Sequence, residues 1–160
     1  MEQILEILEQ NARISNKDLA KLTKKKEADV AKSIKKLEKQ GVIVKYKTVI
    51  NKDLFRDKKN TVALIEVKVS PQKDLGFDYI AERIYRFQEV KSCYLLSGTY
   101  DLLLVIEGKD IHTVSDFVAE KLAPLEPVRA TVTHFMLKKY KEDGVVLKRS
   151  KERKRLSITY

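Results

Sequence analysis

The sequence predicts an α+β protein in which three short helices precede a β-α-β-β-α-β sandwich. Two observations support this fold class. Apolar residues recur every three or four positions through the N-terminal part, and the later part alternates β-branched runs with two further helical patterns. With 160 residues, 43% of them apolar, the chain is long enough for one ordinary domain or two small ones with their own cores.

Two short amphipathic helices are predicted at the start of the chain. The first covers Glu2–Asn11, whose apolar residues share one stripe. The second begins after Ser15, which stands three residues before Asp18 as in a capping box. Its apolar residues, among them Leu19 and Leu22, are expected to face inward.

The stretch Lys24–Gly41 is predicted to form a third, basic helix. Val30, Ile34 and Leu37 are spaced so that they share one face, which must pack against a core. Gly41 follows the last periodic residue, where a left-handed backbone conformation ends many helices. The side opposite the apolar face carries only lysines as its basic residues: Lys32, Lys35, Lys36 and Lys39.

A strand, Val42–Ile50, is expected directly after this helix and would provide the wing of a winged helix-turn-helix. In that fold a basic third helix binds duplex DNA, mainly through the phosphate backbone. The candidate DNA-binding residues are therefore the lysines on or near the third helix and the strand. They are Lys24, Lys25, Lys26, Lys32, Lys35, Lys36, Lys39, Lys45 and Lys47.

The positive charge lies at the two ends of the chain, which has a net charge of +10. Residues 1–50 contain 12 Lys and Arg against 7 Asp and Glu, residues 51–144 contain 15 against 15, and residues 145–160 contain 6 against 1. This segregation indicates a nucleic-acid-binding unit joined to a module with another task. We interpret 145–160 as a basic tail that either keeps the protein soluble or adds electrostatic attraction to DNA.

Residues 51–60 lack periodicity and are predicted to be a linker to a second domain, 61–144. Its expected elements are a strand at Thr61–Val69, a helix at Phe77–Phe87, strands at Val90–Ser97 and Tyr100–Glu107 joined by a tight Gly98-Thr99 turn, a helix capped by Asp110, and a last strand at Val128–Tyr140. This order is that of a ferredoxin-like sandwich, in which two helices cover one face of the sheet.

The second face of that sheet is expected to need a partner. Leu102–Ile106 is apolar at every position, and Phe135–Leu137 repeats the pattern on the last strand. Because large exposed apolar patches are uncommon in monomers, we predict that a second copy of the chain covers this face as a homodimer.

Several functions are disfavoured by composition. Cys93 is the single cysteine and the two histidines stand far apart, so neither a disulfide nor a metal site is expected. The sequence shows neither a nucleophile with a nearby general base nor a phosphate-binding glycine loop. An enzyme is therefore not expected, and no catalytic residue is assigned. No apolar run reaches the length of a membrane span, so we expect a cytoplasmic protein without membrane contact. An RNA-recognition domain is disfavoured because such domains display aromatic residues on their central strands, whereas the central strands predicted for this chain are aliphatic.

Five stretches make the chain resemble the Lrp/AsnC (feast/famine) transcriptional regulators. They are Asn11–Ser15, Asp18–Ala20, Ile34–Ile43, Ser97–Asp101 (Ser-Gly-Thr-Tyr-Asp) and Thr131–Thr133. The resemblance implies dimers, often assembled into octamers, that bind double-stranded promoter DNA and respond to a small amino acid or related metabolite. It implies no other cofactor.

The resemblance places the effector site at seven residues. Gly98 leaves room for a ligand to approach backbone N–H groups, and the Asp101 carboxylate can accept from an ammonium group. Thr99 stands where the family often has Asp, and the recognition helix carries lysine without arginine. An alternative function is therefore a metabolite-sensing, architectural DNA-binding protein of low sequence preference. The effector-binding residues implied are Ser97, Gly98, Thr99, Tyr100, Asp101, Thr131 and Thr133.

Overall fold

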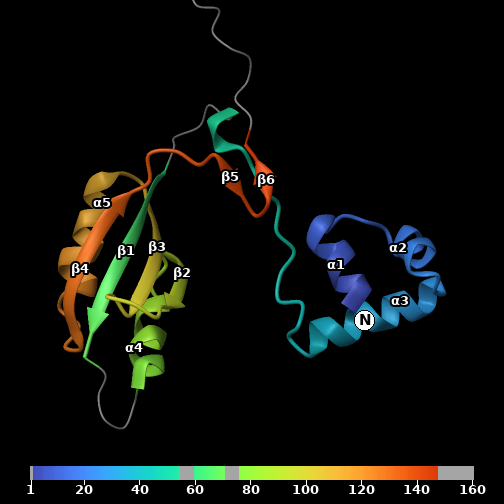
Figure 1. The fold of residues 1–160 in the computed structure, drawn as a ribbon, viewed down its shortest axis with the longest axis horizontal. Helices are drawn as coiled ribbons and strands as arrows, with labels where there is room; N and C mark the ends of the chain where they lie inside the picture. Colours follow the sequence, from blue (N-terminus) through green and yellow to red (C-terminus); the bar gives the residue numbers. More distant parts are fainter. Residues whose placement is uncertain (1, 55–59, 71–75, 148–160) are drawn as a thin grey trace, which may run out of the picture. The chain divides into compact units, whose positions relative to one another are not determined.

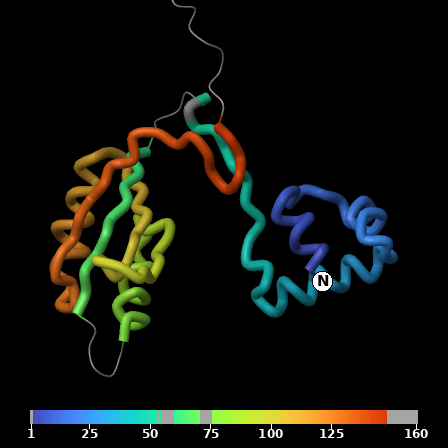
Figure 2. Tube along the Cα trace, in the orientation of Figure 1, coloured from blue at the N-terminus to red at the C-terminus, as the bar shows by residue number. Residues whose placement is uncertain are grey.

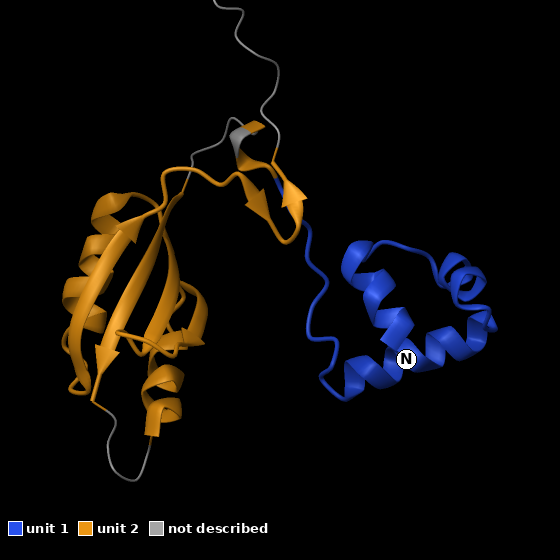
Figure 3. Ribbon diagram, viewed as in Figure 1, with its two compact units in different colours: residues 1–50 blue, residues 51–160 orange. Residues whose placement is uncertain are grey.

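The structure is a computed structural model that describes residues 2–54, 60–70 and 76–147. The chain divides into two compact units, Met1–Ile50 and Asn51–Tyr160 (Figure 3). Each unit has its own buried core, so each is described by itself. Among the described residues, no helix is long and apolar enough to cross a bilayer.

The first unit contains three helices, α1 (Glu2–Gln10), α2 (Asn16–Thr23) and α3 (Glu27–Lys39). Each is amphipathic and directs its apolar stripe toward the other two, as the periodicity predicts. The shared core consists of Ile4, Leu8, Leu19, Ala20 and Val30, with Ile7, Ile14, Ile34 and Ile43 packed against it.

Helix boundaries in this unit follow local capping chemistry. The Ser15 hydroxyl oxygen accepts from the Asp18 backbone N–H at 3.1 Å, which confirms the predicted cap of α2. Lys24 adopts a left-handed conformation (φ 52°) that ends α2, and α3 begins at Glu27, so Lys24–Lys26 at the start of the basic stretch Lys24–Gly41 forms the connection between the two helices. The expected inward position of Leu22 is wrong, because its side chain is 57% exposed.

The predicted strand Val42–Ile50 is not formed. Gly41 has the expected positive φ of 69°, and the N–H groups of Val42 and Ile43 then bond to the carbonyl oxygen of Leu37, at the end of α3. Residues 44–50 continue as an extended trace that pairs with no strand in the described parts of the chain (Figure 2). A β-strand needs a partner strand with which to form hydrogen bonds. This segment has a composition typical of strands but no such partner among the described residues, so the predicted strand does not form.

The second unit is an antiparallel sheet in the order β2-β3-β1-β4, with its helices on one face (Figure 1). Its strands are β1 (Thr61–Val69), β2 (Val90–Leu95), β3 (Leu102–Gly108) and β4 (Val128–Phe135). Its helices are α4 (Gly76–Tyr85) and α5 (Ile111–Asp116), which the π-helical turn η2 (Phe117–Leu122) extends. This arrangement is the predicted ferredoxin-like sandwich.

The strand register separates a buried face from an open face. On β1, Ile65 and Val67 are fully buried beneath the helices together with their β3 partners Leu104 and Leu102. The alternate positions Leu64 and Glu66 point to the other face with their partners on β3 and β4, and all of these are half-buried except His134, which is exposed. Within the described residues, Leu103 and Val105 on the second face of β3 are therefore only partly covered.

Three predicted strand boundaries are wrong: the end of β2, the start of β3 and the end of β4. β2 ends at Leu95 and β3 starts at Leu102, so a six-residue loop, 96–101, replaces the tight turn expected at Gly98-Thr99. β4 ends at Phe135 instead of Tyr140, and Leu137 is 96% exposed.

A small hairpin follows β4 and includes residues predicted as tail. It pairs β5 (Lys141–Glu142) with β6 (Val145–Val146) around Asp143 and Gly144, both with positive φ. Two consecutive positive φ angles are those of a tight hairpin turn, for which Asp-Gly is a favoured pair. The basic residues predicted for the tail, at 148–155, lie outside the described residues.

Candidate nucleic-acid interface and ligand pocket

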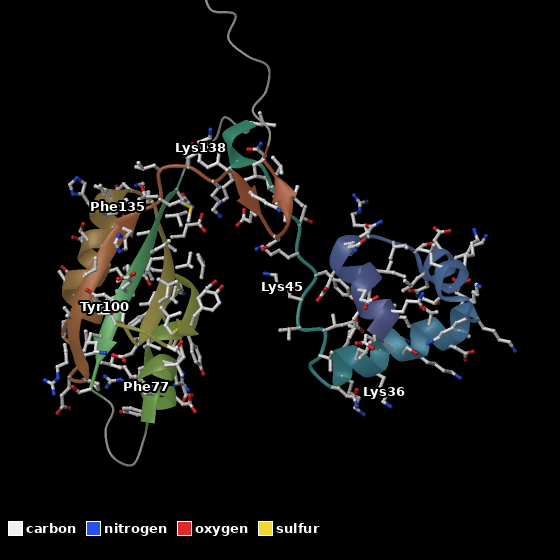
Figure 4. All side chains as sticks on the ribbon, in the orientation of Figure 1. Lys36, Lys45, Phe77, Tyr100, Phe135 and Lys138 are labelled. Atoms are coloured by element: carbon white, nitrogen blue, oxygen red, sulfur yellow. The ribbon has the colours of Figure 1, made fainter. Side chains whose placement is uncertain are left out.

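The lysine face of α3 is exposed over its whole length. Val30 and Leu37 are buried on the opposite side of the helix, which fixes its rotation about its own axis. Figure 4 shows Lys36 extending from α3 and Lys45 from the segment that follows. The nine predicted DNA-binding lysines are all solvent-exposed: Lys24, Lys25, Lys26, Lys32, Lys35, Lys36, Lys39, Lys45 and Lys47.

The charges along α3 also stabilise the helix. Glu27 and Asp29 occupy the first turn, and Lys36 and Lys39 occupy the last turn. This order complements the helix dipole, positive at the N-terminus and negative at the C-terminus. Lys24–Lys26 forms the short connection between α2 and α3, a length typical of a helix-turn-helix.

A side-chain hydrogen bond links the extended segment after α3 to the helix. The Tyr46 hydroxyl donates to a carboxylate oxygen of Glu38 at 2.9 Å. Desolvation by burial, followed by the contact with Glu38, raises the pKa of Tyr46 above its usual value. Lys45 and Lys47 flank Tyr46 in the sequence, so this bond keeps their part of the segment beside α3. Their charges then add to those of the helix.

A pocket of about 310 Å³ in the second unit lies at the loop between β2 and β3. Four of the predicted effector residues, Ser97 to Tyr100, contribute to its lining together with Leu96. The remaining lining residue is Glu66, which comes from the middle of β1. The structure thus brings together a loop and a strand position that are about thirty residues apart in sequence.

Asp101 fastens the loop to the end of β1. One carboxylate oxygen accepts from the Val69 backbone N–H at 2.9 Å, and the other forms a 3.1 Å ion pair with Lys68. Its own backbone N–H donates to the Val67 carbonyl oxygen at 3.0 Å. The backbone bond from Val69 is the main cause that lowers the pKa of Asp101, and Lys68 adds to it. Asp101 therefore lies beside the pocket, with both carboxylate oxygens engaged.

Thr131 and Thr133, the other predicted effector residues, are not brought into this pocket. They pair directly with Val67 and Ile65, which belong to the face of the sheet beneath the helices. Residues paired in this way point to the same side of a sheet. Within one chain the two threonine side chains therefore lie on the face opposite Glu66.

Glu66 is the pocket residue that sequence reasoning missed. Its side chain is 34% exposed, and the His134 Nε2 lies 3.8 Å from a Glu66 carboxylate oxygen. A signal was present in the alternation of β1, because an acidic residue occupies the open face between Leu64 and Lys68. The pattern alone does not reveal that a loop from another part of the chain comes to lie beside it.

A metal centre is not formed by the described residues, since they contain no cluster of three or more histidine, cysteine or carboxylate side chains suited to one. Cys93 is half-buried, and desolvation raises the pKa of its thiol, which disfavours the reactive thiolate.

Comparisons with known proteins find a matching domain family for each of the two units. A family model described as the Lrp/AsnC ligand binding domain matches residues 62–146, and one described as winged helix-turn-helix DNA-binding matches residues 2–44. The uncharacterized HTH-type transcriptional regulator YugG of Bacillus subtilis is 45% identical over 157 residues, which cover 98% of this chain and 95% of that protein. The leucine-responsive regulatory protein of Haemophilus influenzae is 29% identical and covers 91% of this chain and 86% of its own length.

A solved structure also matches across both units. The complex of transcriptional regulator NMB0573 from Neisseria meningitidis with L-methionine is 26% identical, with a TM-score of 0.69, and the match covers 88% of this chain and 89% of that one. A helix-turn-helix joined to a ligand-binding sandwich defines the class of protein, a transcriptional regulator rather than an enzyme. The chain belongs to the Lrp/AsnC family.

Proposed function

We propose that this protein binds promoter DNA as a homodimer through the lysine face of α3 and that a small amino acid in the pocket beside Glu66 modulates this binding. The observation that carries the proposal is the exposed, wholly lysine face of α3 on a helix-turn-helix unit. The point charges of lysine suit phosphate contacts, which provide most of the affinity for DNA and make it sensitive to salt.

The open face of the sheet supports the homodimer. Val62, Leu64, Leu103, Val105 and Val132 share this face and are half-buried in a single chain. A second copy packed on this surface would bury it and would hold two α3 helices in a fixed relation. The operator should then contain two related half-sites separated by about one helical turn, or a multiple of it.

The pocket supports an amino acid as the effector. It offers backbone groups and hydroxyls from the 96–101 loop and a carboxylate from Glu66, a combination that suits a small zwitterion. The similar regulator from Neisseria meningitidis is known as a complex with L-methionine, which makes L-methionine a sensible first probe.

Fluorescence anisotropy on a duplex from the promoter of the protein's own gene, against a shuffled duplex of equal length, tests this function. We expect tighter binding to the promoter, and a change of its affinity when the effective amino acid is added. A coupling of about 1–3 kcal/mol between the two sites corresponds to a change of about 5- to 150-fold. Equal affinity for both duplexes, unchanged by any standard amino acid, contradicts it.

The absence of arginine from the lysine face favours a second candidate function. Lysine lacks the planar fork with which arginine reads guanine, so binding with little sequence preference would make the protein an architectural DNA-binding protein. The same two duplexes distinguish the candidates. Equal affinity for promoter and shuffled DNA, still responsive to an amino acid, would favour the architectural role.

A further inference from the structure

We infer that Tyr46 is a positioning residue for DNA binding: its bond to Glu38 holds the segment after α3 so that Lys45 contacts a phosphate of the duplex that α3 binds. This role rests on the proposed DNA binding through α3, and it adds a second contact together with the residue that positions it. All the residues involved belong to the first unit.

The segment after α3 begins with two backbone bonds and then leaves the helix. The N–H groups of Val42 and Ile43 donate to the Leu37 carbonyl oxygen at 2.9 and 3.2 Å, and Ile43 packs against the core of the first unit. Beyond Ile43, residues 44–50 join no strand ladder among the described residues. The position of Lys45 therefore depends on what its neighbours in this segment contact.

Tyr46 attaches the segment to α3 in two ways. Its hydroxyl donates to a carboxylate oxygen of Glu38, in the last turn of α3, at 2.9 Å. Its ring lines a recess of about 310 Å³ together with the apolar side chains of Leu8, Ile14 and Ile34. Burial, followed by the contact with Glu38, raises the pKa of Tyr46, so the hydroxyl keeps its proton and remains a donor throughout the neutral range. The ring and the charge-assisted hydrogen bond together fix this residue against the helix.

The direction of Lys45 follows from this attachment. Neighbouring residues of an extended backbone point to opposite sides, so Lys45 points away from α3 when Tyr46 points toward it. Figure 4 shows the Lys45 side chain on the side of the segment away from α3, and the residue is exposed. Lys45 is thus presented to a different phosphate from those that the lysine face of α3 reaches.

Holding the segment in place lowers the entropic cost of the Lys45 contact. A lysine on a loose segment loses backbone and side-chain freedom when it meets a phosphate, whereas a segment fastened at Tyr46 has lost part of that freedom already. Ordering one such group corresponds to a factor of about 2 to 12 in affinity. The phosphate contact itself contributes about 0.9 per chain to the slope of log affinity against log salt.

A double-mutant cycle between Tyr46 and Lys45 tests the positioning role. Fluorescence anisotropy on the promoter duplex at several sodium chloride concentrations gives the affinity and salt slope of wild type, Tyr46→Phe, Lys45→Ala and the double variant. Lys45→Ala should lower the slope by about 0.9 per chain, and Tyr46→Phe should weaken binding by about 2- to 12-fold. Because Tyr46 acts through Lys45, the double variant should bind with the affinity of Lys45→Ala alone.

Two comparisons separate the bond from the loss of a charge or a hydroxyl. Glu38→Gln and Glu38→Ala remove the same charge, but only glutamine keeps an oxygen that accepts from the Tyr46 hydroxyl. Glu38→Gln should therefore bind DNA about 2- to 12-fold more tightly than Glu38→Ala, which tests the bond without changing Tyr46. Tyr85→Phe, at an exposed tyrosine of α4, removes a hydroxyl elsewhere and should keep the wild-type affinity. Circular dichroism melting curves establish that each variant is folded.

Three results would overturn the role of Tyr46 while leaving DNA binding through α3 in place. The first is a folded Tyr46→Phe protein with wild-type affinity, and the second is a Lys45→Ala protein with wild-type affinity and salt slope. The third is a loss from Tyr46→Phe that is equally large with and without Lys45, which is the result of a general structural effect. Wild type that binds no duplex refutes both this role and the proposed function.

Discussion

Replacing Lys32, Lys35 and Lys36 with alanine should weaken DNA binding across all sequences and make it less sensitive to salt. These side chains are exposed on the side of α3 opposite the buried Val30 and Leu37. Each phosphate contact contributes about 0.9 to the slope of log affinity against log salt, so losing three contacts lowers the slope by about 2.7 per α3 helix and about 5 per dimer.

The fold should survive this change. Alanine has the highest helix propensity, and substitutions on an exposed surface usually alter the free energy of unfolding by less than about 0.5 kcal/mol. Circular dichroism melting curves of variant and wild type should therefore agree. Fluorescence anisotropy with one labelled duplex, repeated at several sodium chloride concentrations, then gives the affinity and its salt slope for each protein.

A matched variant separates the lysine face from net charge. Lys91, Lys109 and Lys141 are exposed residues of the second unit, and replacing them with alanine removes the same three charges. This control should keep a salt slope close to that of wild type. The reasoning is refuted if the α3 variant, still folded, keeps the wild-type affinity and slope, or if the control lowers the slope as much.

Three further predictions concern other parts of the chain. Asp101→Ala should lower the free energy of unfolding by about 1–3 kcal/mol in urea melts at neutral pH, since the Val69 N–H loses its acceptor. Because the pKa of Asp101 is lowered in the folded state, its contribution is present above the unfolded pKa of about 3.9 and is lost as the pH falls through the lower folded value. The difference between the two proteins should therefore shrink in acid, and a constant difference would contradict this. Leu103→Asp, on the open face of the sheet, should give folded monomers in light scattering. Leu22→Asp, at an exposed leucine of α2, should leave the molar mass of the wild-type assembly unchanged. A dimeric Leu103→Asp protein would contradict an interface at the sheet. Deleting the residues after Leu147 should weaken binding at low salt equally for promoter and shuffled duplexes, and an altered preference would show that the tail makes specific contacts.

Much of the fold could be predicted because local chemistry determines it. The cap at Ser15, the left-handed Gly41 and the cap at Asp110, whose carboxylate accepts from the Thr113 N–H at 2.8 Å, all act within a few residues. The strand Thr61–Val69 has the predicted bounds because its apolar alternation matches one buried face.

The features that could not be predicted depend on contacts between distant residues. The 96–101 loop is held open beside Glu66 because Asp101 bonds to the end of β1, the strand next to β3 and more than thirty residues earlier in the sequence. The segment 44–50 has the composition of a strand but lacks a partner, and the pattern cannot supply one. Thr131 and Thr133 fall on the helix side of the sheet because of the register of β4 against β1.

Sequencing the genomic DNA bound by the purified protein, with and without the amino acid that calorimetry selects, tests the central claim most directly. The claim is that the protein binds promoter sites with the lysine face of α3 against the DNA backbone and that a ligand in the pocket beside Glu66 changes which sites are bound. We predict enriched sites with two related half-sites about 10 base pairs apart, or a multiple of it, and a changed set of sites when the ligand is present. Uniform coverage of the genome in both conditions would contradict the account.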